Sequence, residues 1–436
     1  MDLFLKYLTL QDPNVRYVAL ATLLLGGVSG AVGSFNFLRK KTLVGETVAH
    51  SMLPGVLIAF LLSGVKNPYV LIIGAATSGW LSILLVDYIT QQSKIKGDSA
   101  LAIVLSSFFG FGIVLLTVIQ SNYGGEQSGL DHYIFGNAAA MTPEYSTAFA
   151  WVSGLVLILV LSFYHSIKSV VFNLEYADAI GINVKFIDGL ISFITILSIS
   201  VGIKAVGIVM MSALLIIPPT AARFWTNSLV RLLLLSGFFG ALAGWLGAFV
   251  SYSQASMPTG PWTIVIISLI AFVSMLFAPK RGVIYQRWSK LLLKRRINEE
   301  NLLKTAVQNE VRGPGKLFNR RSISQRQFFE QRLWNRTVRR LRRKGLIKKV
   351  HTGFTLSTQG RSYGAEIDRR HKIWEIYLQR RMQMSINLVH DEAETMEHFL
   401  TPEIEAEILG ELGLCSRFNP LLEIHELVPD NPINAL

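Results

Sequence analysis

The sequence predicts an all-α polytopic membrane bundle of eight or nine transmembrane helices, followed by a soluble and mainly helical block. Nine apolar runs follow one another between residues 17 and 278, and most approach the roughly 20 residues that a helix needs to span a bilayer. After residue 280 no apolar run is long enough to span, and lysine and arginine become frequent. The chain therefore divides into a membrane part and a soluble part.

The distribution of charge supports this division. Residues 1–280 carry 14 basic and 11 acidic side chains, residues 281–390 carry 27 and 7, and residues 391–436 carry 1 and 11. The net charge of +13 thus conceals a strongly basic module followed by an acidic one. The single cysteine, Cys415, excludes an internal disulfide framework and agrees with a reducing compartment for the soluble block.

Basic residues beside the apolar runs predict an orientation. If nine spans start from an outer N-terminus, almost all the basic clusters between residues 39 and 281 fall on one side, which the positive-inside rule assigns to the cytoplasm. Lys204 is the one basic residue that fits this arrangement poorly. The soluble block is then expected in the cytoplasm.

One pair of polar residues within the membrane part suggests metal chemistry. Glu46 and His50 are four residues apart, so a helix places them on one face. A carboxylate and an imidazole in this arrangement can together contact a divalent transition metal. The alternative is a capped, hydrogen-bonded pair at a helix entrance. Ionisable groups at membrane depth are costly without a function, which favours the metal interpretation.

Several sequence blocks share an order that is typical of one transporter family. They are His50–Gly55, Asp98–Gly112, Phe135–Asn137, Asn173–Gly181, Ala205–Arg223, and Ser251-Tyr252 with Pro258–Pro261. With these blocks the chain resembles the permease subunits of ABC importers for manganese, zinc and iron, the ABC-3 family. The resemblance covers nearly all of residues 17–280.

The resemblance implies partners and a location. A permease of this kind lies in the bacterial cytoplasmic membrane, pairs with itself or a sister subunit, is fed by an external metal-binding protein and is driven by a separate ATPase. The chain has no G-x-x-x-x-G-K-[ST] loop, so we expect a transport channel subunit and not an enzyme. Glu175, Ala177 and Gly181 match the place where such permeases dock their ATPase; the alternative is an ordinary amphipathic loop helix.

The first half of the soluble block predicts a winged helix-turn-helix. A helix is expected over 298–313, and a second runs through 327–344 and stops at Gly345. Two short β-prone pieces at 346–347 and 354–356 then form a wing. Five arginines of the second helix would contact DNA phosphates and the groove: Arg336, Arg339, Arg340, Arg342 and Arg343. The alternative is a basic helix on anionic lipid, which does not need the wing.

The second half carries a cluster of metal-binding residue types. Glu394, Glu397 and His398 lie on one helical face, and His371 with Glu375, and His390 with Glu394, are each four residues apart. Carboxylates and imidazoles without a nearby thiolate suit a metal such as manganese or iron. A solvated acidic helix would explain the glutamates but not three histidines in register.

These residues resemble the iron- and manganese-dependent repressors of the diphtheria-toxin-repressor family over 298–415. The resemblance implies a regulatory site at Glu394, Glu397 and His398 and a neighbouring site at His371, Glu375 and His390. Glu300 is a candidate ligand from the first helix, whereas Leu303 or Lys304 stands where manganese-type members have another carboxylate.

The sequence therefore predicts four parts: a transmembrane permease domain (1–280), a basic linker (281–297), a winged-helix DNA-binding domain (298–365) and a metal-binding and dimerisation domain (366–436). We expect an importer permease for Mn²⁺ or Fe²⁺, or for Zn²⁺, fused to a metal-dependent repressor that binds operator DNA. The alternative is a permease whose cytoplasmic domain senses metal and gates transport without touching DNA.

Overall fold

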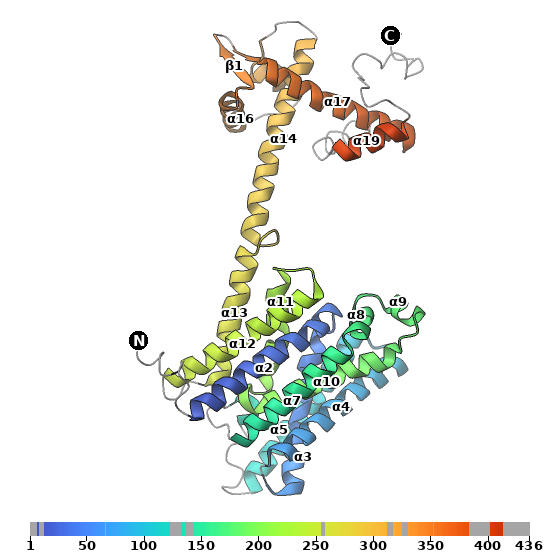
Figure 1. Cartoon of the computed structure of the whole chain (residues 1–436), viewed down its shortest axis with the longest axis vertical. Helices are drawn as coiled ribbons and strands as arrows, with labels where there is room; N and C mark the ends of the chain where they lie inside the picture. The colour runs from blue at the N-terminus through green and yellow to red at the C-terminus, as the bar shows by residue number, and fades with distance from the viewer. Residues whose placement is uncertain are drawn as a thin grey trace. The chain divides into compact units, whose positions relative to one another are not determined.

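The structure is a computed structural model, and it describes residues 7, 13–65, 67–122, 132–136, 143–253, 258–311, 317–324, 330–351, 353–382 and 402–412. The chain forms two compact units, Met1–Gln286 and Arg287–Leu436 (Figure 1). We name them the membrane unit and the C-terminal unit. His390, Glu394, Glu397 and His398 lie outside the described residues.

The membrane unit is a bundle of apolar helices. Within the described residues eight of them are long and apolar enough to cross a membrane, in agreement with the predicted eight or nine spans. They are α2 (Pro13–Leu38), α3 (Thr42–Ser63), α4 (Pro68–Gln92), α5 (Gly97–Asn122), α7 (Pro143–Ser162), α10 (Val184–Val206), α12 (Leu229–Ser253) and α13 (Thr259–Phe277). The seventh apolar run, near 205–222, forms the shorter helix α11 (Ile208–Arg223), whose 16 residues rise only about 24 Å.

Small residues set the packing of these helices. Gly26 of α2 and Gly240 of α12 face one another so closely that a Cβ on either would overlap the carbonyl oxygen of the other. Further along the same two helices, the hydroxyl groups of Ser34 on α2 and Ser236 on α12 form a hydrogen bond of 2.7 Å. Gly55 of α3 and Gly74 of α4 make a second contact of the same kind. Close backbone approach replaces the hydrophobic effect as the source of helix association in lipid.

The long helix α14 (Val283–Val311) starts just before the boundary at Arg287, and most of it belongs to the C-terminal unit. After it come α15 (Arg320–Ser324), α16 (Gln331–Arg343), the strands β1 (Ile347–Val350) and β2 (Gly353–Leu356), α17 (Thr358–Arg381) and α19 (Pro402–Glu411). The two strands pair antiparallel with Ile347 opposite Leu356, which confirms the predicted hairpin. Figure 1 shows the hairpin, α16 and the end of α14 gathered beside the start of α17.

One core joins α14, α15, α16, the hairpin and the start of α17. Leu302 and Leu303 of α14 pack in it with Trp334 and Leu341 of α16 and with Ile347 of β1. The apolar residues of α16 are buried on one face and its arginines lie mostly on the other. The core therefore fixes which face of α16 meets the solvent.

Two helix starts differ from the prediction. The helix expected over 327–344 begins at Gln331. The helix expected from residue 298 begins at Val283, so most of the basic stretch predicted as a linker is helical. Residues 283–297 are rich in leucine, lysine and arginine, which favour helix, and contain no glycine or proline to interrupt it. The predicted stop at Gly345 is confirmed, since this glycine adopts the left-handed φ of 74° after the end of α16.

Candidate metal sites and nucleic-acid surface

The predicted transport pair lies on α3. Glu46 and His50 are both partly buried there, one helical turn apart. The His50 ring stands edge-on to Phe109 of α5, with 4.8 Å between ring centroids. Its Nδ1 atom is buried, and no group in the described part of the chain hydrogen-bonds to it. A buried imidazole nitrogen without a partner is costly to keep unless something binds it.

Pro54 adds a second open group at the same position. It lies inside α3, four residues after His50. Because proline has no N–H, the backbone carbonyl of His50 loses its usual helical donor. His50 can therefore offer a ring nitrogen, and its main chain an oxygen, to a cation that also meets the Glu46 carboxylate.

The predicted ATPase-docking residues are brought together around α9 (Leu174–Ala179). Asn173 caps this helix by accepting a hydrogen bond from the backbone N–H of Tyr176 at 2.9 Å. Ala177 is fully buried and anchors the helix, whereas Glu175 is exposed and lines a groove of about 650 Å³ with Gly181. Glu175 and Gly181 thus lie on the surface, and the buried Ala177 holds α9 in place.

An ion-pair cluster near the same end of the unit escaped the sequence analysis. Arg39 and Lys41 both approach Asp188 at the start of α10, with N–O distances of 2.5 and 3.5 Å. Asp87 of α4 lines the same cavity of about 400 Å³. The available signal was an aspartate inside an apolar run, since such a residue needs a partner.

The poorly fitting Lys204 also finds a structural explanation. Its Nζ lies 5.0 and 5.5 Å from the ring centroids of Tyr133 and Tyr145, and the two tyrosine hydroxyls hydrogen-bond at 2.8 Å. Aromatic faces attract an ammonium group away from bulk water. Lys204 therefore need not follow the distribution of the other basic residues.

In the C-terminal unit, two of the predicted metal ligands pair with one another. His371 of α17 is almost fully buried, and its Nε2 lies 3.0 Å from Oε1 of Glu375. The α14 residue that reaches this imidazole is Lys304, with Nζ 3.5 Å from Nδ1. A protein cation therefore stands where the resemblance implied a metal ligand.

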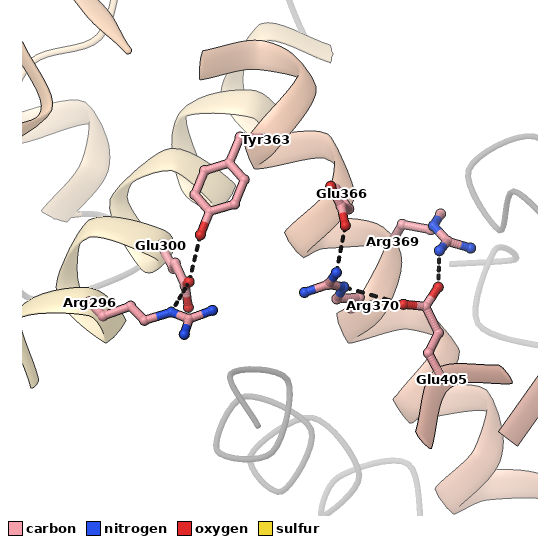
Figure 2. Close-up of polar contacts among 7 residues, drawn as sticks. All are labelled: Arg296, Glu300, Tyr363, Glu366, Arg369, Arg370 and Glu405. Atoms are coloured by element: carbon pink, nitrogen blue, oxygen red, sulfur yellow. Dashed lines mark hydrogen bonds and ion pairs between the residues drawn. The ribbon is translucent and has the colours of Figure 1, made fainter. Parts of the chain in front are cut away.

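Glu300, the other candidate from α14, is held by different groups (Figure 2). Its Oε1 accepts hydrogen bonds from Nε of Arg296 and from the hydroxyl of Tyr363, both at 2.7 Å. The bond to Glu300 raises the pKa of Arg296 above its ordinary value. Burial, and then the same carboxylate, raise the pKa of Tyr363 to about 12. This network joins α14 to α17 through direct hydrogen bonds.

A second ionic network, which the sequence analysis missed, joins α17 to α19. Arg369 donates to Glu405, and Arg370 pairs with Glu405 at 3.3 Å and with Glu366 at 2.5 Å (Figure 2). The apolar contact of Ile373 with Ile408 and Leu409 lies beside it. Within the described residues, no three His, Cys, Asp or Glu side chains gather in a metal-binding arrangement.

The arginines of α16 divide into two groups. Arg336, Arg339, Arg342 and Arg343 are exposed. Arg340 is instead half-buried, and its Nε lies 2.8 Å from Oε1 of Glu299 on α14; Lys344 holds the other oxygen of that carboxylate at 2.6 Å. Four of the five predicted DNA-binding arginines thus form a basic surface, and Arg340 fixes α16 to α14.

Comparison with known proteins identifies both parts. The ABC 3 transport family matches residues 11–278. The chain belongs to this family. Residues 357–417 match a second family, described as the metal binding and dimerisation domain of the iron dependent repressor. This ABC-3 chain therefore joins a permease domain to a C-terminal repressor-type domain, as the two resemblances predicted.

Relatives extend the match beyond the membrane unit. The manganese transport system membrane protein MntC of Bacillus subtilis is 34% identical over 380 residues, 87% of each chain. The zinc transport system membrane protein TroC of Treponema pallidum is 38% identical over 279 residues, 64% of this chain and 94% of that protein. PsaBC from Streptococcus pneumoniae in complex with Fab has 30% identity and a TM-score of 0.59, covering 66% of this chain and 99% of that one.

Proposed function

We propose that this ABC-3 chain is the permease subunit of an ATP-driven importer of Mn²⁺ or Fe²⁺, with Zn²⁺ as a third candidate cargo, and that its C-terminal unit is a metal-dependent DNA-binding repressor. The partners are a separate ATPase that docks around Glu175, Ala177 and Gly181, an external metal-binding protein, and a second permease subunit, the same or a sister. The C-terminal unit works in the cytoplasm.

The observation that carries the import function is the buried Nδ1 atom of His50. This atom is buried and has no hydrogen-bond partner among the described residues. His50 lies one helical turn after Glu46, and an imidazole with a carboxylate suits a divalent transition metal. The relatives named for manganese and zinc transport support the class of cargo.

The test is ATP-driven uptake of radioactive Mn²⁺ into proteoliposomes that contain the chain with its ATPase. Glu46→Gln should lower uptake at least tenfold, because the charge that attracts the cation is lost. Glu144→Gln is the control, since Glu144 is exposed at the start of α7. Uptake by Glu46→Gln that equals the control would contradict the proposal.

The repressor function rests on a different observation. Helix α16 presents exposed arginines next to an antiparallel hairpin, which supports the predicted winged helix-turn-helix. We propose that Glu394, Glu397 and His398 bind the regulatory metal and that the bound metal sets the DNA-binding surface. Ligand groups must be deprotonated to bind metal, so DNA affinity should fall as the pH is lowered.

The second candidate function is a domain that senses metal and gates transport without binding DNA. The observation that favours it is that α14, which carries Glu299 and Lys304, begins at Val283, only six residues after the last span ends at Phe277. The full chain in nanodiscs, mixed with a labelled duplex from upstream of its own gene, separates the two. A metal-dependent rise in the fluorescence anisotropy of the duplex that is lost in Glu397→Ala supports the repressor. Metal binding without any change in that anisotropy supports the gating domain.

A further inference from the structure

We infer that the buried His371 and its partly exposed partner Glu375 hold the ammonium group of Lys304 in place of a divalent metal ion. Lys304 and His371 are 4% and 3% exposed. The three side chains form a chain of contacts from α14 to α17, with Nζ of Lys304 at Nδ1 of His371 and Nε2 of His371 at the Glu375 carboxylate. The inference rests on the proposed metal-sensing role of the C-terminal unit.

The contacts occupy both nitrogens of the imidazole. An ammonium group can only donate a hydrogen bond and an ionised carboxylate can only accept one. Nδ1 of His371 therefore faces a donor and Nε2 faces an acceptor, which matches one neutral tautomer of the ring. The single lone pair that a metal would need points at a cation of the protein itself.

Charge balance leads to the same conclusion. A buried ammonium group is costly unless it is paired and hydrogen-bonded, and here the imidazole links Lys304 to the carboxylate of Glu375. A divalent cation at the same place would meet Lys304 as a like charge. The site therefore already contains the cation that its carboxylate requires.

The nearby buried carboxylate is engaged as well. Asp368, one turn before His371 on α17, accepts a hydrogen bond from Gln308 of α14 at 2.5 Å, and its other oxygen lies 3.7 Å from Lys372. Direct side-chain contacts thus join α14 to α17 at successive turns. We conclude that this joint forms without metal and leaves metal dependence to Glu394, Glu397 and His398.

The experiment counts Mn²⁺ ions bound per full-length chain in nanodiscs, from the free Mn²⁺ signal in electron paramagnetic resonance. Glu375→Gln, a mild change at a partly exposed side chain, and His371→Ala should both bind as many ions as the wild type. Glu397→Ala should bind fewer. Loss of one ion in Glu375→Gln would overturn the inference, whereas an unchanged count in Glu397→Ala would count against the metal-sensing role instead.

A gain of binding provides the second arm. Lys304→Glu puts two carboxylates beside an imidazole, a donor set that suits manganese, so the count should rise by one ion per chain. Adding His371→Ala should remove the gain. Lys304→Gln, which removes the charge without adding a ligand, is the matched control. A folded Lys304→Glu protein that gains no ion would contradict the claim that Lys304 keeps the metal out.

Discussion

Two histidines, one in each unit, meet very different surroundings. His50 of the membrane unit has a buried Nδ1 with no partner in the described residues, whereas both ring nitrogens of His371 in the C-terminal unit contact charged side chains of the protein. Both residues are four positions from a glutamate, His50 after Glu46 and His371 before Glu375. The same four-residue spacing thus occurs with an unpartnered ring nitrogen in the described part of the membrane unit and with two engaged ring nitrogens in the C-terminal unit.

The difference shows what decides whether such a pair can bind metal. Around His50 the helices approach through glycines such as Gly55 and Gly74, and Pro54 leaves the His50 carbonyl without its usual helical donor. Around His371 the helices are held by the polar side chains themselves. A group that holds the fold together is not free to bind a passing cation.

The largest expected effect concerns the rigid frame of the membrane unit. Gly26→Val should lower stability by about 3 kcal/mol or more, because its side chain would overlap the carbonyl of Gly240 in a tightly packed contact. The measurement is the thermal unfolding of the protein in detergent. Gly154→Val in α7 is the matched control, since nothing lies within 4 Å of its Cβ position. Equal melting temperatures for the two variants would refute this packing argument.

The next effect concerns the joint between α14 and α16. Glu299→Gln removes a nearly buried carboxylate that pairs with both Arg340 and Lys344. Because both cations are partly exposed, we expect a cost of about 1–2 kcal/mol, less than for a fully buried pair. Hydrogen exchange in α16 should accelerate accordingly. Glu366→Gln removes only a more exposed partner of Arg370 and should leave α16 exchange as in the wild type.

A smaller effect tests the exposed arginines. Arg339→Gln should weaken binding to duplex DNA severalfold and reduce the slope of log affinity against log salt by about 1, as expected for one lost phosphate contact. Arg16→Gln, an exposed arginine of the membrane unit, is the control. Unaltered salt dependence in Arg339→Gln would remove this residue from the DNA surface.

The smallest effect is a pH dependence of the metal-free network. The pKa of Tyr363 is raised from its ordinary value near 10 to about 12. Its contribution to stability is therefore complete below pH 10 and is lost as the pH rises toward 12. Because the ring is partly exposed, this loss should stay under about 1 kcal/mol. Chemical unfolding of wild type and Tyr363→Phe should converge over that range, and parallel curves would contradict the assignment.

The sequence predicted the helices and strands of each unit better than the side-chain contacts between those helices and strands. Apolar runs and Gly345 determined the spans and the end of α16, because length and backbone freedom act locally. The role of Lys304 could not be read from the sequence, since it depends on how α14 meets α17. Arg340 was grouped with the DNA-binding arginines for the same reason: only the packing shows that it faces Glu299.

The most direct test of the contrast between the two histidines is Mn²⁺ uptake by proteoliposomes with His50→Ala and His371→Ala assayed side by side. We predict that His50→Ala lowers uptake at least tenfold, while His371→Ala retains wild-type uptake at saturating ATP. Wild-type uptake by His50→Ala, in a protein shown to be folded, would contradict the account.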